Sequence, residues 1–500
     1  MIDSTRTADH AAGTSTAWLD PSLADGVRTV ALIGTGAGRG LDVLLARRPG
    51  LRVVAFEPDA AIARTLTARL VARGETEAVA VVAGPAYAGA ADVARQFPDL
   101  HHAPLLMDPS LLSADPDAAS RAREALARVT FQTSANEGAR RASAGRYLLH
   151  TLSNAPRIAR ESDVRALEGL TTGMPAIIAA AGPSLDANIH DLSPVRDRAI
   201  LISCDTAARP LLSLGIEPDF IVGADPSRAN AAHIASLPAS AAWLVAEGSL
   251  HPSALTTFEH RAFFFNVSPH HPWPWLASVG FDRMTLPTWG SVATSCFSLA
   301  LLMGCDPIVF IGADFAFTGG RPYCRGTSFE AQWATWIAGG ADYPAIWQTL
   351  VDRWPPTTAP DLEGRPVRTA RHLVSFRDWM VERAGASGRR VVNATGAGLL
   401  FGDGIAQSTA SDTLGAAAAV PRDLLHETIR AAHGSARGSL ARLLAGVDGV
   451  LDGSGDGTRD AWMRATDNTV TPAAIRSALR SSEHLAWSLA RTSSSTKDPL

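Results

Sequence analysis

The chain has few cysteines and no cluster of them, with four among its 500 residues. None lies in a C-x-x-C or similar pair, so the spacing does not support the common zinc-binding or redox motifs. Cys204 and Cys296 fall inside a predicted strand and a predicted helix, where a thiol usually behaves as a small hydrophobic side chain. This usage fits a reducing compartment, and we expect a cytoplasmic protein.

An excess of charge of either sign is also missing, because 45 basic and 49 acidic residues give a formal net charge of -4. The composition therefore shows no electrostatic footprint for nucleic acid or an anionic membrane, and we expect neither as a partner. The first 20 residues are polar and contain no apolar stretch of the signal-peptide type. No G-x-S-x-G motif is present, so serine hydrolysis is not expected.

The longest apolar region, 297–317, raises the question of a membrane span. Asp306-Pro307 interrupts it and Asp314 ends it. We therefore expect a helix, a tight turn and a buried strand, with no membrane span.

Short apolar runs that stop at Gly, Ser or Asp recur through the middle of the chain. They alternate with helical segments, which is typical of a doubly wound α/β fold with a parallel sheet. The predicted strands are Ala176–Ala181, Ala199–Cys204, Asp219–Ala224, Ala242–Ala246, Ala262–Val267, Ile308–Ala313 and Arg390–Asn393.

Three domains are predicted: residues 1–140, 141–410 and 411–500. The first has strands at 27–34, 51–56, 78–84 and 104–108, with a glycine-rich turn after the first strand, and we expect a Rossmann-like fold. Its G-x-G-x-G spacing departs from the dinucleotide fingerprint and is closer to S-adenosylmethionine sites. We expect this turn not to be catalytic. The third domain is expected to be helical, after a linker at 407–423 and before a disordered tail.

Polar residues at the ends of the central strands are the candidate site. Gly182 and Pro183 force a sharp exit from the first strand, and Ser184 could cap the next helix or present free N–H groups to a phosphate. Three carboxylates, Asp205, Asp225 and Asp314, end neighbouring strands, with Glu247 and Asn266 at two others. Because ligands bind at the carboxyl ends of parallel strands, these residues predict one crevice for sugar hydroxyls or a Mg²⁺ ion.

Three further segments carry candidate residues. Ser291 is a natural N-cap for the helix that follows it. The loop at 268–275 contains His270, His271, Trp273 and Trp275, which could form an acceptor platform or simply pack the loop. His372 is the candidate general base outside that loop.

Several of these motifs together resemble the central domain of the motility-associated factor (Maf) glycosyltransferases. They are GPSLD at 182–186, DTA at 205–207, GIEPDF at 215–220, DP at 225–226, GSVA at 290–293, GCDPIVFIGAD at 304–314 and NATGAG at 393–398. The N-terminal glycine turn is similar to the Rossmann-like domain of the same proteins. The central motifs also resemble bacterial family 42 sialyltransferases and 6-hydroxymethyl-dihydropterin diphosphokinases. The resemblance implies a sialyltransferase-like fold for the central sheet.

The resemblance to Maf implies transfer of a nonulosonic acid, of the pseudaminic or legionaminic type, from a CMP-activated donor to flagellin Ser or Thr. The resemblance to the sialyltransferases implies His372 as the catalytic base. The nucleotide-sugar-binding residues that it implies are Gly182, Pro183, Ser184, Leu185, Asp205, Thr206, Asp225, Pro226, Ser227, Gly290, Ser291, Asp314 and Tyr323. No cofactor is required by this reading, although Mg²⁺ is compatible with the carboxylates.

The chain departs from the sialyltransferase pattern where the donor phosphate would bind. Ala316 stands where those enzymes have a tyrosine, and Tyr323 could supply a substitute. Asp205 and Asp225 stand where they have asparagine. Two alternatives therefore stay open: a Mg²⁺-dependent pterin diphosphokinase, and an inactive scaffold that binds flagellin.

Overall fold

The computed structural model divides into two compact units, Met1–Arg140 and Arg141–Leu500, which we call the N-terminal unit and the main unit. The structure describes residues 26–36, 38–84, 90, 93, 96–97, 99–100, 103–267, 270–435, 440–454 and 457–480. The predicted disordered tail, the start of the chain and residues 268–269 of the His/Trp loop lie outside them.

The N-terminal unit contains a four-stranded parallel sheet in the order β3-β2-β1-β4. Alternate residues of β1 pack into two separate apolar clusters, one on each face of the sheet, so both faces are covered. This is the predicted Rossmann-like arrangement. Its elements are β1 (Thr29–Ile33), α1 (Arg39–Arg47), β2 (Arg52–Glu57), α2 (Ala60–Arg73), β3 (Val79–Ala83), β4 (Leu105–Met107) and α4 (Pro109–Ala114).

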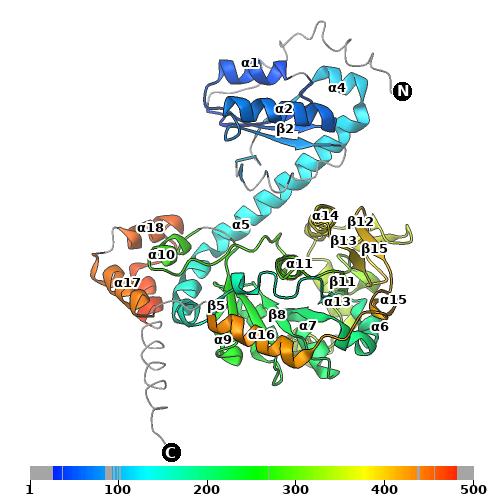
Figure 1. Cartoon of the computed structure of the whole chain (residues 1–500), viewed down its shortest axis with the longest axis vertical. Coiled ribbons are helices and arrows are strands. Elements are labelled where there is room, and N and C mark those ends of the chain that lie inside the picture. Colours follow the sequence, from blue (N-terminus) through cyan, green and yellow to red (C-terminus); the bar gives the residue numbers. More distant parts are fainter. Residues whose placement is uncertain are drawn as a thin grey trace, which may run out of the picture. The chain divides into compact units, whose positions relative to one another are not determined.

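The main unit is built on a nine-stranded sheet in the order β15-β14-β11-β6-β7-β8-β9-β10-β5, and every neighbouring pair is parallel (Figure 1). All seven predicted strands are present. The strands are β5 (Ser162–Asp163), β6 (Ala176–Ala179), β7 (Ile200–Cys204), β8 (Phe220–Gly223), β9 (Trp243–Glu247), β10 (Ala262–Phe265), β11 (Ile308–Ile311), β14 (Val391–Asn393) and β15 (Ile405–Gln407).

The chain winds outward from β6 to β10, then returns to the other side of β6 with β11 and continues to β15. The sheet is therefore doubly wound, and its topological switch point lies between β6 and β11. In such sheets the crevice outside the carboxyl ends of the two strands is the usual ligand site.

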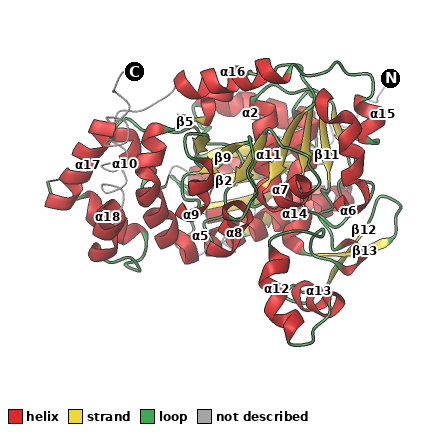
Figure 2. Cartoon of the chain, turned by 90° about the horizontal axis from the view of Figure 1, so that it is seen from below, coloured by secondary structure: helices red, strands yellow, loops and turns green. Residues whose placement is uncertain are grey.

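Helices cover both faces of this sheet (Figure 2). Leu244 and Phe264 pack with helices α5 and α7–α9 on one face, while Trp243 and Phe263 contact His433 of α16 on the other. The elements outside the sheet are α5 (Pro116–Arg160), η4 (Val164–Leu167), α6 (Leu185–Asn188), η5 (Ile189–Arg198), α7 (Asp205–Ser213), α8 (Arg228–Ala235), α9 (Pro252–Leu255), η6 (Thr256–Phe258), α10 (Trp273–Ser278), α11 (Val292–Leu302), η7 (Thr318–Gly320), α12 (Phe329–Ala338), α13 (Tyr343–Val351), β12 (Thr357–Pro360), β13 (Pro366–Thr369), α14 (Arg371–Ala386), α15 (Ala410–Leu414), α16 (Arg422–Ser435), α17 (Leu440–Asp452) and α18 (Thr458–Ala465).

The long apolar region folds as expected, with helix α11, a turn at Gly304–Pro307 and the buried strand β11. Among the described residues, no helix combines the length and apolarity needed to cross a bilayer.

The expected linker at 407–423 is wrong, because much of it is bound to the central sheet. It contains α15, and the Val420 N–H donates to the Asp197 carbonyl at 2.7 Å. The Arg422 guanidinium bonds both oxygens of buried Asp219, at 2.8 and 2.9 Å. Helices α16–α18 follow, and they belong to the same compact unit as the sheet.

Candidate functional site

The switch point is closed by one hydrogen-bonded junction between the loops after β6 and β11. The Ser184 hydroxyl donates to Asp314 Oδ2 at 2.6 Å, and the Ser184 N–H points to the same carboxylate at 3.3 Å. Both residues are buried, at 8% and 1% exposure. Two of the predicted binding residues, 130 positions apart in sequence, therefore form a single structural element.

Gly182 is required by this junction. A Cβ atom at Gly182 would lie 2.0 Å from Asp314 Oδ2 and 2.5 Å from the Gly312 carbonyl oxygen. Gly312 itself has φ +66°, and a Cβ there would lie 2.3 Å from the Ala180 carbonyl. The two loops approach so closely that only glycine fits at these points.

The expectation that this turn presents free N–H groups to a phosphate is wrong. The Gly182 N–H donates to Gly312 at 2.8 Å, and the Leu185 N–H donates to Gly182 at 3.0 Å. Ser184 does not cap α6, because its hydroxyl is bonded to Asp314. Leu185 is fully buried and packs under the turn rather than facing a ligand.

Asp314 is held from a second side by the NATGAG segment. The Ala313 N–H donates to Thr395 Oγ1 at 3.0 Å, and the Leu399 N–H donates to the Asp314 carbonyl at 2.8 Å. A Cβ at Gly398 would lie 2.2 Å from that carbonyl oxygen. Burial raises the pKa of Asp314, and the hydrogen bonds from Ser184 oppose the rise.

An acidic group continues the same edge at β7 and β8. Asp205 is 3% exposed, and its Oδ1 accepts hydrogen bonds from the Thr206 N–H at 2.7 Å and the Thr206 hydroxyl at 3.1 Å. Burial raises the pKa of Asp205 to about 7, with a further contribution from the charge of Asp225. Tyr323 faces both carboxylates: its pKa is raised to about 12, first by burial and then by Asp205 and Asp225. The residue as a whole is 37% exposed, so the burial that raises the pKa of Tyr323 is that of its hydroxyl end.

Asp225 starts the turn into α8. Its Oδ1 accepts the Ser227 N–H at 2.7 Å, and Ser227 caps the helix by accepting the Asn230 N–H at 3.2 Å. Pro226 between them is buried. Asp225 is half-buried, so its second oxygen is the part of this turn that can meet a ligand.

Two further residues of this edge, Tyr147 and His233, were not proposed from the sequence, and Glu247 was proposed only as one of the strand-end acids. Burial raises the pKa of Tyr147 on α5 to about 12, and the charges of Glu247 and Asp225 add to it. Burial also raises the pKa of Glu247 to about 7, against hydrogen bonds from Ser249. His233 on α8 bonds Ser328 through Nδ1, and its buried Nε2 has no partner among the described residues. No motif marks Tyr147 or His233, whereas Glu247 had been recognised as a strand-end residue.

Ser291 and His372 lie at this same edge. The C-terminal end of α11 bonds to the segment just before β6, since the Gly169 N–H donates to Leu302 at 2.9 Å, so Ser291 at its other end lies at the carboxyl edge. Ser291 caps α11 by accepting the Ala293 N–H at 3.3 Å, and Gly290 beside it is exposed with φ +76°.

Helix α14 also starts at this edge, because Thr369 donates to the Phe315 carbonyl at 2.8 Å just before the helix begins. His372 contacts the rings of Trp354 and Phe376, with centroids 4.2 and 5.6 Å away. Burial lowers the pKa of His372 to about 4, so the imidazole is neutral near pH 7.

Two arginines near the junction form hydrogen bonds or an ion pair within the chain. Arg321 forms an ion pair with Asp186 and donates to the Pro183 carbonyl at 2.9 Å. The Arg325 N–H bonds Asp186 at 2.8 Å. Ala316, where the sialyltransferases have tyrosine, is 4% exposed and offers no donor.

Two other candidates prove structural. Asn266 accepts from Thr285 at 2.6 Å and donates to the Arg283 carbonyl. Trp273 and Trp275 are 7% and 8% exposed and belong to the apolar core, so these two rings pack the loop, whereas His270 and His271 of the same loop are exposed.

The glycine turn of the N-terminal unit is closed by its own chain. Glu57 Oε2 accepts the Thr35 N–H at 2.8 Å, the Thr35 hydroxyl at 2.6 Å and the Gly36 N–H at 3.3 Å. A Cβ at Gly38 would lie 2.0 Å from Arg69 Nη2. Internal groups therefore occupy the N–H donors that a phosphate would need.

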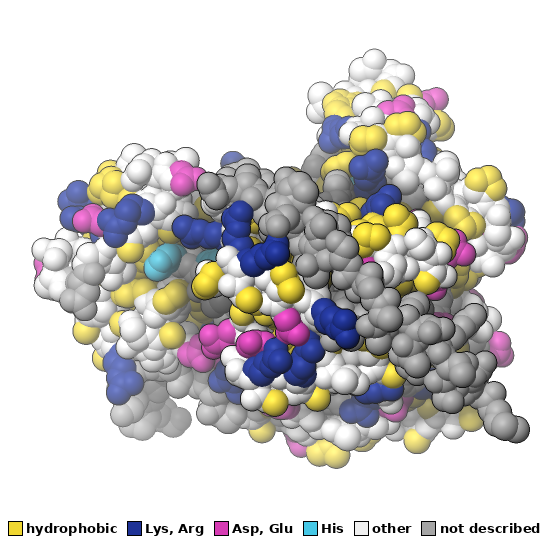
Figure 3. Space-filling model, turned by 90° about the horizontal axis from the view of Figure 1, so that it is seen from above, with side chains coloured by type: hydrophobic (Ala, Val, Ile, Leu, Met, Phe, Trp, Pro, Cys, Tyr) yellow, Lys and Arg dark blue, Asp and Glu magenta, His cyan; other side chains and the backbone are white. Residues whose placement is uncertain are grey.

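No group of three or more His, Cys, Asp or Glu side chains converges into a metal site within the part of the chain that the structure describes. On the face shown in Figure 3, basic and acidic side chains are interspersed, in line with the balanced composition.

Comparison with known proteins places the site within a recognised segment. Two relatives are uncharacterized proteins of Treponema pallidum (strain Nichols). One is 33% identical over 138 residues, which cover 24% of this chain and 34% of the relative. The other is 36% identical over 73 residues, which cover 14% of this chain and 35% of the relative. The chain thus spans about a third of the length of these curated relatives. The solved structure of the Maf glycosyltransferase from Magnetospirillum magneticum AMB-1 aligns with 92% of this chain and 73% of its own, at 17% identity and a TM-score of 0.48.

A family model matches residues 149–320, and its description is "6-hydroxymethylpterin diphosphokinase MptE-like". This is one of the three groups that the motifs resemble. The matched segment runs from the end of α5 through β6 and β11 and contains both sides of the Ser184–Asp314 junction, together with Asp205 and Asp225. Tyr147, Tyr323 and His372 lie outside it.

Proposed function

We propose that the chain is a glycosyltransferase that moves a nonulosonic acid, of the pseudaminic or legionaminic type, from a CMP-activated donor to flagellin Ser or Thr. It would act in the cytoplasm and support flagellum assembly and motility. The Ser184–Asp314 junction at the switch point carries this proposal. Nucleotides bind across such points in doubly wound sheets, and the motifs on both sides resemble CMP-dependent transferases.

The acidic group beside the junction fits hydroxyl recognition. Asp205, Asp225 and the Tyr323 phenol interact electrostatically at this edge and supply acceptors and a donor, which suit the hydroxyls of a ribose or a sugar. Negative charge at this place disfavours a bare phosphate. We therefore place the sugar and ribose on the β7–β8 side, and the phosphate toward Ser291 at the start of α11.

Two residues are candidates for the base that accepts the proton of the acceptor hydroxyl. His372 is neutral at working pH because burial lowers its pKa to about 4, whereas Asp205 has a pKa near 7, which is better matched to general base catalysis. A base must be deprotonated, so activity falls as pH drops through its pKa. We nevertheless propose His372, because it occupies the region of the sialyltransferase histidine base and stands on α14, which begins beside the loop after β11. An acid limb near pH 4 in the pH–rate profile of transfer supports it. A limb near pH 7 that Asp205→Asn abolishes would assign the base to Asp205.

The binding test compares CMP, GMP and ATP, each with and without Mg²⁺, by titration calorimetry on the full chain. We expect CMP to bind most tightly without a metal. Asp225→Ala should weaken CMP binding by about 1–3 kcal/mol, the cost of losing a polar partner, while Asp225→Asn keeps a hydrogen-bonding group and should cost less. An unchanged CMP affinity in a folded Asp225→Ala protein would remove Asp225 from the site.

The transfer test incubates the chain with a CMP-nonulosonate and flagellin and measures the intact mass of flagellin. A mass increase that depends on donor and enzyme supports the proposal. Binding of flagellin without any mass increase would instead favour the inactive scaffold, which the buried Ala316 in the tyrosine position keeps open.

The second candidate function, a pterin diphosphokinase, is favoured by the family match over residues 149–320. It requires ATP and Mg²⁺. Tight ATP binding that depends on Mg²⁺, with no CMP binding, would replace the glycosyltransferase proposal with this one.

A further inference from the structure

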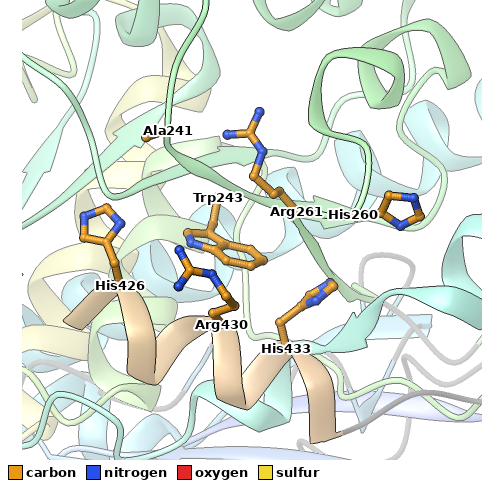
Figure 4. Close-up of a pocket in the computed structure, with 7 residues that line it drawn as sticks. All are labelled: Ala241, Trp243, His260, Arg261, His426, Arg430 and His433. Carbon is orange, nitrogen blue, oxygen red and sulfur yellow. The ribbon is translucent and has the colours of Figure 1, made fainter. Parts of the chain in front are cut away.

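A second concave site lies at the opposite edge of the main sheet. A cavity of about 410 Å³ is lined by Ala241, Trp243, His260, Arg261, His426, Arg430 and His433 (Figure 4). Trp243 is the first residue of β9 and Arg261 immediately precedes β10, so this cavity is at the amino ends of the strands. The candidate transferase site is at their carboxyl ends, and the two sites are therefore separate. We call this cavity the α16 pocket.

The floor of the α16 pocket is aromatic. Trp243 and His433 are 6% and 3% exposed, and their ring centroids are 5.0 Å apart. Phe263 lies behind them, with its centroid 5.5 Å from Trp243 and 5.3 Å from His433. Such a wall offers a planar ligand both apolar area and ring contacts.

The one buried acid beneath this floor is already compensated. Glu161 is 1% exposed and bonds His433 Nε2 at 2.7 Å and Arg157 Nη2 at 2.7 Å. Burial alone would raise the pKa of Glu161, but the His433 hydrogen bond and the Arg157 charge outweigh it and hold the pKa below its ordinary value. These bonds also fix the orientation of the His433 ring.

The rim is basic. Arg430 and His426 lie one turn apart on α16 beside Trp243, and Arg261 lies on the other side of the indole (Figure 4). Arg430 is exposed, and neither it nor His426 makes a hydrogen bond or ion pair with another described residue. Arg261 donates through Nη1 to the carbonyls of Ser240 and Ala242 at 2.6 and 3.1 Å and through Nη2 to the Thr257 carbonyl at 3.5 Å. All three acceptors are neutral, so they leave the charge of Arg261 uncompensated.

None of the described residues that line the pocket is an aspartate or a glutamate. The acid closest in the fold to Ala241, Glu217, accepts hydrogen bonds from Ser240 and from the Ala241 N–H at 2.7 Å. The pocket thus combines two guanidinium groups and the imidazoles of His260 and His426 with an aromatic floor, and no carboxylate is among its lining residues.

We propose that the α16 pocket binds a small organic phosphate that carries a planar ring. The ring packs against Trp243 and His433, and the phosphate lies between Arg430 and Arg261, because guanidinium groups bind phosphate oxygens with paired hydrogen bonds. The cavity volume is within the range of small-molecule sites, which favours a compact ligand over a polypeptide. This site does not depend on the proposed transferase activity.

The test uses phenyl phosphate, inorganic phosphate and benzyl alcohol as probes in calorimetric titrations of the full chain. Phenyl phosphate should bind at least about tenfold more tightly than either of the others, since each supplies only one half of the recognition. Equal affinity for phenyl phosphate and inorganic phosphate would overturn the proposal, because the floor would then contribute nothing. Failure of phenyl phosphate to bind more tightly than about 10 mM would overturn it as well.

Variants locate the binding. Arg430→Glu should reduce phenyl phosphate affinity by about tenfold or more, and the milder Arg430→Gln by less. Arg464→Glu, at an exposed arginine of α18 outside the pocket, is the matched control and should leave the affinity unchanged. Asp225→Ala should also leave it unchanged, which separates this pocket from the carboxyl-edge site. Equal losses in Arg430→Glu and Arg464→Glu would show a diffuse charge effect and refute the pocket.

Discussion

Replacing Asp205 by asparagine should stabilise the main unit at alkaline pH. The Asp205 side chain is buried, and its pKa rises from 3.8 to about 7. A carboxyl with a raised pKa in the folded state binds its proton more tightly there than in the unfolded chain. The free energy of unfolding therefore falls as pH rises from about 4 to about 7, and the full penalty is present above that window.

The magnitude follows from the size of the shift. About three pKa units at about 1.4 kcal/mol each give a penalty of at most about 4 kcal/mol at pH 8, and roughly a third of it at pH 5. Asparagine keeps the oxygen that accepts from Thr206 and cannot ionise. Its advantage over the parent should therefore be larger at pH 8 than at pH 5 by up to about 3 kcal/mol, several degrees in melting temperature.

The assay is scanning calorimetry of the parent, Asp205→Asn and the control Asp403→Asn at both pH values. Asp403 is exposed, so its replacement should move the transition little at either pH. A stability difference between Asp205→Asn and the parent that is the same at pH 5 and pH 8, or larger at pH 5, would refute the reasoning.

Three further outcomes are expected. Gly182→Ala should lower stability by about 1–3 kcal/mol and abolish nucleotide binding, because its Cβ would overlap the Asp314 carboxylate; a normal melting curve with normal binding would contradict the junction. Arg422→Ala should cost about 1–3 kcal/mol in thermal unfolding, since buried Asp219 loses one of its two ion-pair partners and keeps Arg196, and a loss below about 1 kcal/mol would show that Arg196 suffices. Gly36→Arg has room for its Cβ but strains the backbone at φ +48°, so it should lower the stability of the N-terminal unit somewhat and leave flagellin modification by the folded protein intact; lost modification with an unchanged melting curve would give the N-terminal turn a functional role.

The sequence was a good guide to the sheet and a poorer guide to its margins. Six of the seven predicted strands are apolar runs of four or more residues, the seventh, Arg390–Asn393, has only two valines in its centre, and each is present. Strands β5 and β15 are two and three residues long and carry Ser, Asp and Gln, so no hydrophobic pattern marks them. The linker was misjudged because its role depends on Arg422 reaching Asp219, 203 positions earlier in the chain.

The sequence likewise predicted the positions of several site residues but not their hydrogen-bond partners. Strand-end position brings Asp205, Asp225 and Asp314 to one edge, as their pattern indicates. Periodicity cannot say which partners they have there, so the use of Ser184 as a donor to Asp314 was hidden. Tyr147 joins the edge from a helix that precedes the whole sheet, and nothing in its local sequence distinguishes it from a residue of the core.

The position of β11 beside β6 has a consequence during synthesis. The Ser184–Asp314 bond spans 130 residues, and at about 5–20 residues per second the ribosome needs roughly 6 to 26 s to make that stretch. Throughout this time β6 has β7 on one side and an open edge on the other. An open apolar edge strand is a template for pairing with other chains. Nascent chains of this protein should therefore depend on chaperone protection until β11 emerges, and any pause in translation before residue 308 should lower the yield of native protein.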